Sequence, residues 1–280
     1  MAKSALLKSS LAKKYWMALT GLFLCLFLIG HLLGNLQLLA TGENAALNFN
    51  KYALFMTTNP AVKLLSYLTY FSILFHAVDG IVLTVQNKKA RPVGYVKNSP
   101  SSNTVWASRN MAVLGTLILV FIVTHMVNFW AVMHFDKNMP LQTKRVEVNG
   151  VGKDYYLTTD GGYIATDDVG EYGKYEIKNR TEFYVPQANI KVNEGYKDLY
   201  KVTVDFFKDE KWGLIATILY VFAMFVLAFH LYHGFSSAFQ SLGLNNPKYN
   251  SLIKNFGKAF SVVVPLLFAS IPVFIHFILK

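Results

Sequence analysis

The chain has 280 residues, of which 53% are hydrophobic and 15% are charged, and its formal net charge at pH 7 is +11. Soluble proteins of this size carry nearer a quarter of charged residues, so the composition argues against an ordinary soluble protein. Cys25 is the single cysteine, which excludes an intrachain disulfide, a thiolate zinc site and a cysteine-ligated iron–sulfur cluster on this chain.

The apolar residues cluster in five blocks, each near the roughly 20 residues that a helix needs to cross a bilayer. In chain order the blocks cover about 16–40, 61–86, 110–134, 212–240 and 258–279. The first block is too long for a secretory signal peptide and no clear small-x-small cleavage site follows it, so we expect a retained membrane anchor. The sequence therefore predicts an all-α membrane protein, a bundle of five transmembrane helices forming a single membrane domain over residues 1–280.

Between the third and fourth blocks, residues 141–206 differ in composition. The stretch "KRVEVNGVGKDYYLTTDGGYIAT" alternates apolar and polar residues around Asn149-Gly150 and Asp160-Gly161. Such dipeptides between alternating segments favour β-hairpins. We expect a small β-rich insertion on the outer face that covers the helix ends. The sequon-like Asn179-Arg180-Thr181 is too short a motif to carry weight.

The positive charge alternates along the chain instead of forming one basic patch. The segments before the first block, between the second and third, and between the fourth and fifth are lysine-rich and hold no acidic residue, whereas residues 135–211 have 12 basic and 14 acidic residues. This alternation follows the positive-inside rule and predicts a cytoplasmic N-terminus and an external C-terminus. It argues against binding of nucleic acid. The basic residues of the three inner segments are Lys3, Lys8, Lys13, Lys14, Lys88, Lys89, Arg91, Lys97, Arg109, Lys248, Lys254 and Lys258.

Histidines lie well inside four of the five blocks, whereas His134 and His276 lie at or near the outer ends of the third and fifth. At a helical rise of 1.5 Å, His31 and His125 lie about 22 and 24 Å from the inner edge of the membrane. His76 and His230 lie about 22 and 27 Å from the outer edge, on helices of the opposite direction. The four residues thus form an outer and an inner pair, roughly 15–20 Å apart along the membrane normal.

Two imidazoles at one depth, from two helices, are what bis-histidine ligation of haem iron requires, and bundle cores commonly hold such cofactors. Gly34, Gly80 and Gly234 lie one turn from a histidine, where a missing side chain leaves room for a flat macrocycle, although small residues also serve helix packing. Zinc would need its ligands around one point. A proton relay would need acids near the histidines, and Asp79 is the only one inside a block. No nucleophile motif is present, so we expect no catalytic residue.

The chain resembles the dihaem cytochrome b membrane-anchor subunit of succinate dehydrogenases and fumarate reductases, respiratory complex II, in its single-chain, five-helix bacterial form. The resemblance rests on "FLIGHLLGN", "LFHAVDGI", "LVFIVTHMVNFW" and "FHLYHGFSSAFQSLG" and covers the helical three quarters of the chain. It implies two haems b, with His31, His76, His125 and His230 as ligands of the haem iron. His233 is the alternative fourth ligand.

Two positions depart from the family. Leu242 stands where the family has the tryptophan of a Trp-Gly pair, and Ser241 stands where some members have a basic residue that binds a haem propionate. Arg109 and Trp106, at the inner start of the third block, are the alternative propionate partners, or else plain interface anchors.

The resemblance also implies partners and a location. A flavoprotein subunit and an iron–sulfur subunit would bind on the cytoplasmic side of a bacterial membrane, and this chain would be a non-catalytic electron-transfer subunit that binds membrane quinone, with menaquinone expected. The lysine-rich inner segments are either docking surfaces or topology signals only. The quinone candidates are Asn35, Gln37, Glu43, Asp79 and Asn128.

Two other functions stay open. One is the cytochrome b anchor of another membrane oxidoreductase, such as a hydrogenase or formate dehydrogenase. The other is a transporter without redox centres, although five blocks with four depth-matched histidines do not suggest the paired inverted halves of many transporters.

Overall fold

The structure is a computed structural model that describes residues 9–90, 93, 106–148 and 150–279. Five helices in this part of the chain are long and apolar enough to cross a membrane, as the sequence predicted. The third span continues from α7 through the π-helical segment η2 (Met126–Ala131) into α8 (Val132–Phe135). The helices that carry the five spans are α2 (Ser10–Asn35), α4 (Pro60–Lys89), α7 (Met111–His125), α10 (Gly213–Ser241) and α11 (Pro247–Phe277).

Four of the spans form a ring. Helix α2 packs against α4, α4 against α7, α7 against α10, and α10 against α2. Helices α2 and α7 are therefore diagonal to each other, as are α4 and α10. Helix α11 packs outside this ring on α10 and α2, around a core that includes Leu32, Leu231 and Phe260.

The last helix begins earlier than predicted, at Pro247 instead of near residue 258. The physical reason is a start signal outside the apolar block: the Asn246 side chain accepts a hydrogen bond from the backbone N–H of Lys248 (2.9 Å), and Pro247 occupies the first turn, where its missing N–H costs nothing. Before it, Gly243 ends α10 with a φ of 76°, the left-handed conformation in which glycine is favoured.

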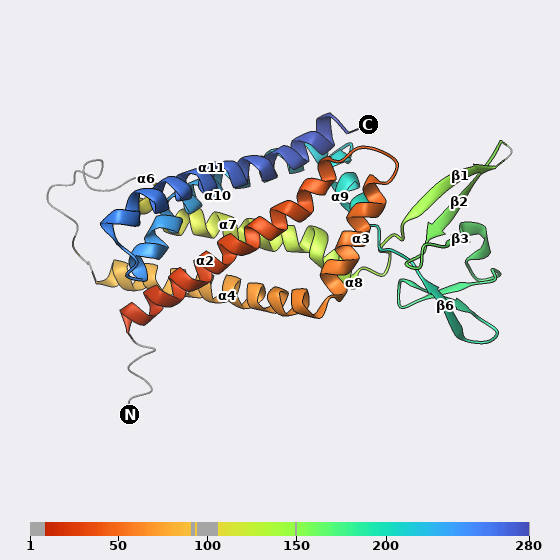
Figure 1. Cartoon of the computed structure of the whole chain (residues 1–280), viewed down its shortest axis with the longest axis horizontal. Helices are drawn as coiled ribbons and strands as arrows, with labels where there is room; N and C mark the ends of the chain where they lie inside the picture. Colours follow the sequence, from red (N-terminus) through yellow and green to blue (C-terminus); the bar gives the residue numbers. More distant parts are fainter. Residues whose placement is uncertain (1–8, 91–92, 94–105, 149, 280) are drawn as a thin grey trace, which may run out of the picture.

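One end of the bundle is closed by elements that the sequence analysis did not expect (Figure 1). These are α3 (Ala45–Thr58) and α9 (Leu199–Lys208), which contact each other, and the 3-10 helix η1 (Leu36–Leu39). Leu38, Phe49 and Phe207, one from each element, are buried with Ile271 and Ile275 of α11. This cluster seals the end of the bundle that lies toward the insertion.

The predicted β-rich insertion is confirmed as two antiparallel sheets beside the sealed end of the bundle (Figure 1). The Gly150 and Gly161 turns join strands as expected, although Asn149 lies outside the described residues. The prediction was wrong for the end of the segment, because residues 199–208 form helix α9, whose first turn is capped by the Asp198 side chain. One sheet contains β1 (Thr143–Val148), β2 (Val151–Leu157) and β3 (Tyr163–Ala165), and the other contains β4 (Glu176–Lys178), β5 (Glu182–Val185) and β6 (Ile190–Glu194).

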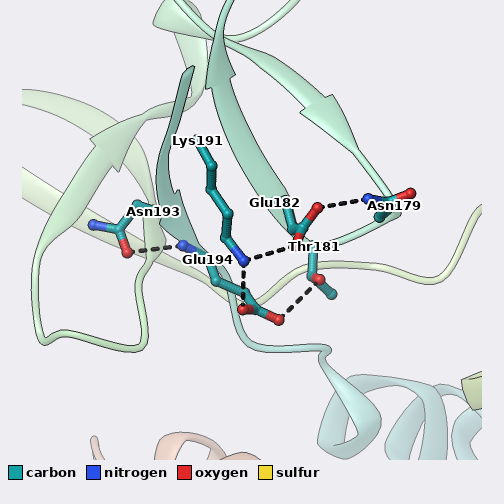
Figure 2. Close-up of polar contacts among 6 residues, drawn as sticks. All are labelled: Asn179, Thr181, Glu182, Lys191, Asn193 and Glu194. Atoms are coloured by element: carbon teal, nitrogen blue, oxygen red, sulfur yellow. Dashed lines mark hydrogen bonds and ion pairs between the residues drawn. The ribbon is translucent and has the colours of Figure 1, made fainter. Parts of the chain in front are cut away.

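Charged side chains link strands of the second sheet (Figure 2). The Lys191 ammonium lies between two carboxylates, 2.7 Å from Glu182 and 3.0 Å from Glu194. Asn179 donates to Glu182 (2.6 Å) and Thr181 donates to Glu194 (3.2 Å). These contacts between polar side chains hold β5 and β6 in register.

The insertion is tied to the ends of several spans. Lys197 donates to the carbonyl of Met133 (2.7 Å) and Arg180 donates to that of His134, so two cations satisfy carbonyls at the C-terminal end of the third span. Lys144 pairs with Glu43 after the first span at 2.6 Å. The expected covering of helix ends is therefore seen at these contacts.

Candidate cofactor site

The outer histidine pair comes together as the depth estimate predicted. The rings of His31 on α2 and His125 on α7 lie 5.9 Å apart, centroid to centroid, with an interplanar angle of 87°. Aromatic rings surround them, with Phe27 stacked on His31 at 5.2 Å and Phe121 stacked on His125 at 5.6 Å. Phe268 of α11 lies 5.7 Å from His31.

The inner pair has nearly the same geometry on the other diagonal. The rings of His76 on α4 and His230 on α10 lie 6.2 Å apart with an interplanar angle of 69°. His233, the alternative partner, instead lies 3.2 Å from the Ser237 hydroxyl through its Nε2. The geometry therefore pairs His230, and not His233, with His76.

Two glycines that the sequence analysis overlooked fix the level of the inner pair. A Cβ at Gly21 of α2 would lie 3.1 Å from Cε1 of His76, and one at Gly115 of α7 would lie 3.8 Å from Cε1 of His230. On each of these helices the glycine precedes the outer-pair histidine by about ten residues, which is roughly 15 Å at the helical rise. The two pairs thus occupy two levels of one bundle.

Two of the three glycines named from the sequence have neighbours other than a histidine. A Cβ at Gly34 would lie 2.6 Å from the Tyr52 ring, so Gly34 accommodates α3 and not a group beside His31. A Cβ at Gly80 would meet the Met17 methyl group at 3.7 Å, and one at Gly234 would meet nothing within 4 Å.

One imidazole of each pair lacks a hydrogen bond at its Nδ1 atom among the described residues. Buried polar groups in proteins are nearly always hydrogen bonded. Yet Nδ1 of His125 and Nδ1 of His230 are buried and have no hydrogen-bond partner within the described structure. Each pair therefore contains an imidazole that is not held in place by a hydrogen bond at Nδ1.

The spacing fits a metal held between two imidazoles. If both imidazoles of a pair bound one metal at about 2.0–2.1 Å each, their ring centres would lie roughly 6 Å apart. No group of three or more His, Cys, Asp or Glu side chains that could hold a metal ion is found among the described residues. A metal at either pair would take its other ligands from a non-protein group, and a porphyrin supplies four.

A π-helical segment follows His125 directly, which the sequence analysis also missed. Such segments are rare and occur often at functional sites. Within it, Asn128 donates to the Tyr220 hydroxyl at 3.4 Å, and the Tyr220 ring lies 6.0 Å from that of His125. Asn128, a quinone candidate, is thus next to the outer pair and already has a partner.

Of the other quinone candidates, Asn35 and Gln37 lie two residues apart at the end of the first span, and Glu43 and Asp79 lie elsewhere. Asn35 donates to the carbonyl of His31 (2.8 Å), and Gln37 lies in η1. Glu43 is exposed, and its hydrogen bond and charge interaction with Lys144 lower the pKa of its carboxyl, which does not favour proton exchange near neutral pH. Asp79 follows His76 by one turn of α4, at the inner level.

The predicted propionate partners lie on the inner side. Trp106, in the short helix α6 (Trp106–Arg109), packs against Phe229 at 5.5 Å, and Phe229 is the neighbour of His230 in the chain. Arg109 ends the same short helix and has an interaction partner. Trp106 is therefore near the inner pair, and Arg109 follows it by three residues at the end of the same short helix.

The fold and these pairs define a helix-bundle protein with five helices compatible with membrane crossing and two paired-histidine sites. Comparisons with models of known families, with curated proteins and with solved structures found no match to this chain.

Proposed function

We propose that this chain is a dihaem cytochrome b that spans a membrane and carries electrons across it. The observation that carries the proposal is the diagonal pairing of four histidines at two levels, with ring separations of 5.9 and 6.2 Å. When bound, haem b supplies a one-electron iron couple whose potential depends on its axial ligands and surroundings.

The chain's own residues have separable roles in this proposal. His31 with His125, and His76 with His230, hold the two irons. Trp106 and Arg109 are the proposed partners of the propionates of the inner haem. The aromatic rings around the outer pair, together with the cluster that seals the bundle end, keep water away from that site.

We further propose that the chain is the haem- and quinone-binding anchor subunit of a succinate:quinone oxidoreductase in a bacterial cytoplasmic membrane. Support comes from the family resemblance of the histidine segments. In this role the chain passes electrons between an iron–sulfur subunit and membrane quinone, anchors that subunit and a flavoprotein subunit, and has no reaction of its own with succinate.

The charge pattern supports the orientation. Lys88, Lys89, Lys248 and Lys254 belong to the bundle end opposite the β insertion, as do Lys13 and Lys14 at the start of α2. The positive-inside rule makes this end cytoplasmic. Lys3, Lys8, Arg91 and Lys97, which belong to the same pattern, lie outside the described residues.

The test is a reduced-minus-oxidised visible spectrum of the purified chain with a measurement of haem per polypeptide. We expect a b-type band and two haems per chain. A chain without haem would overturn the electron-carrier proposal and favour a transporter. Co-purification then identifies the complex: a flavoprotein and an iron–sulfur protein with succinate dehydrogenase activity support the proposed anchor, whereas hydrogenase or formate dehydrogenase partners support the alternative.

A further inference from the structure

The four paired histidines differ in what their Nδ1 atoms contact. Nδ1 of His76 lies 3.2 Å from the hydroxyl of Thr20, which is on another helix and is buried. Nδ1 of His31 faces the amide nitrogen of Asn35 at 3.4 Å, on its own helix. Those of His125 and His230 have no partner within the described structure. The inner pair is therefore the one with a hydroxyl contact from a neighbouring helix.

The direction of the Thr20–His76 hydrogen bond follows from the other contacts of the hydroxyl. A threonine hydroxyl has one proton to donate and two lone pairs that accept. Oγ1 of Thr20 donates to the carbonyl of Trp16 at 2.7 Å, on its own helix. With its proton used there, Oγ1 accepts from His76, so Nδ1 of His76 carries the proton.

The contact with Thr20 therefore favours the tautomer of His76 with a protonated Nδ1. The unprotonated Nε2 of His76 is then the nitrogen free to bind a metal.

Two adjacent residues of α2 determine how the His76 ring is placed. Gly21 lets the ring come close, since a Cβ there would lie 3.1 Å from Cε1 of His76, and Thr20 holds Nδ1. Two consecutive residues of one helix thus set both the distance and the tautomer of a ring from the next helix. Partners of this kind orient ligating histidines and increase their basicity.

We infer that Thr20 is a positioning residue that fixes the His76 tautomer and lowers the reduction potential of the inner haem relative to a site without this acceptor. The inference rests on the proposed dihaem function. A more basic imidazole stabilises the ferric iron more than the ferrous iron, and ligand hydrogen bonding is one of the means by which proteins set haem potentials. The outer pair has no equivalent hydroxyl in the contacts described above.

The experiment is a redox titration of the haem band in membranes holding the full chain. The inner component is assigned as the one lost in His230→Ala and the outer as the one lost in His125→Ala. Thr20→Val keeps the side-chain shape and removes the hydroxyl, and Thr20→Ser keeps the hydroxyl. Thr116→Val is the matched control, because Thr116 adjoins Gly115 at the inner level, is exposed and donates to the carbonyl of Ala112 on its own helix.

We expect Thr20→Val to raise the ratio of reduced to oxidised inner haem at a given potential by up to tenfold. For a one-electron couple this is a rise of about 59 mV in reduction potential. The outer component should not move, and Thr20→Ser and Thr116→Val should resemble the unmodified chain. Loss of the inner haem in Thr20→Val with retention in Thr20→Ser also supports the inference. An unchanged inner potential in Thr20→Val, or equal effects of the valine and serine variants, overturns it. Absence of haem from the unmodified chain would instead overturn the proposed function, and the inference with it.

Discussion

The rings of His76 and His230 lie 6.2 Å apart, although α4 and α10 stand at opposite corners of the four-helix ring and are not neighbours in it. Rings from two helices that are not neighbours therefore meet across the diagonal of the bundle. His233 does not share this position, since it lies beside Ser237.

The first prediction separates these two histidines. His230→Ala should leave one haem per chain, because the inner pair loses a partner, whereas His233→Ala should keep both. Haem content per polypeptide and the visible spectrum measure this. Loss of haem in His233→Ala alone would mean that the ring pairing in the structure does not reflect ligation.

The second prediction uses the two glycines at the inner level. Gly21→Ala should displace His76 and reduce inner-haem content, because the added Cβ would lie 3.1 Å from the ring. Gly115→Ala should be tolerated, since 3.8 Å is an ordinary van der Waals contact. Gly30→Ala is a control on the same helix as Gly21, because its Cβ would meet nothing within 4 Å. Equal haem content in all three variants would contradict the close approach at Gly21.

The third prediction concerns a buried polar network that joins α3 to the insertion. Asn50 is 1% exposed and donates to Gln142 (3.1 Å) and to Asp198 (2.8 Å), and its carbonyl oxygen accepts from the backbone N–H of Tyr200 (2.9 Å). Asn50→Ala leaves buried partners unsatisfied, and such a loss costs about 1–3 kcal/mol for each group.

Thermal unfolding and protease sensitivity of the insertion in membranes measure this change, and both should show destabilisation. Asn48→Ala, at an exposed position of the same helix, is the matched control and should behave as the unmodified chain. If the two variants were equally stable, the network would not hold the insertion on the bundle.

The fourth prediction is a pH dependence of the second sheet. Hydrogen bonds from Lys191 and then Asn179 hold the pKa of the Glu182 carboxyl below its ordinary value. Because the folded-state pKa is the lower one, the pairing stabilises the sheet above the unfolded-state pKa of about 4.3 and is lost as the pH falls through the folded-state value.

Protease resistance of the insertion should therefore fall in acid, and Lys191→Met should weaken this dependence on pH. Lys137→Met, which removes the same charge from an exposed position before β1, should keep it. An identical acid profile for the two variants would show that the Lys191 cluster does not set the dependence.

Much of the architecture was readable from the sequence. The five apolar blocks, the alternating charge and the hairpin dipeptides predicted the spans and the insertion, because hydrocarbon and β-turn geometry each impose a local pattern. The levels of His31, His76, His125 and His230 were also predictable, since a straight helix converts residue number into depth at a constant rise.

Other features were decided by the tertiary structure. The depth of a histidine along its helix does not determine which other ring it faces. The packing order α2–α4–α7–α10 places the two helices of each histidine pair on a diagonal of the bundle. The approach of Gly21 and Thr20 to His76 depends on the rotation of α2 against α4, which no local pattern encodes. The helix α9 and the π-helical turn after His125 were likewise not predicted, because they form where the chain packs against the sealed end of the bundle and its aromatic cluster.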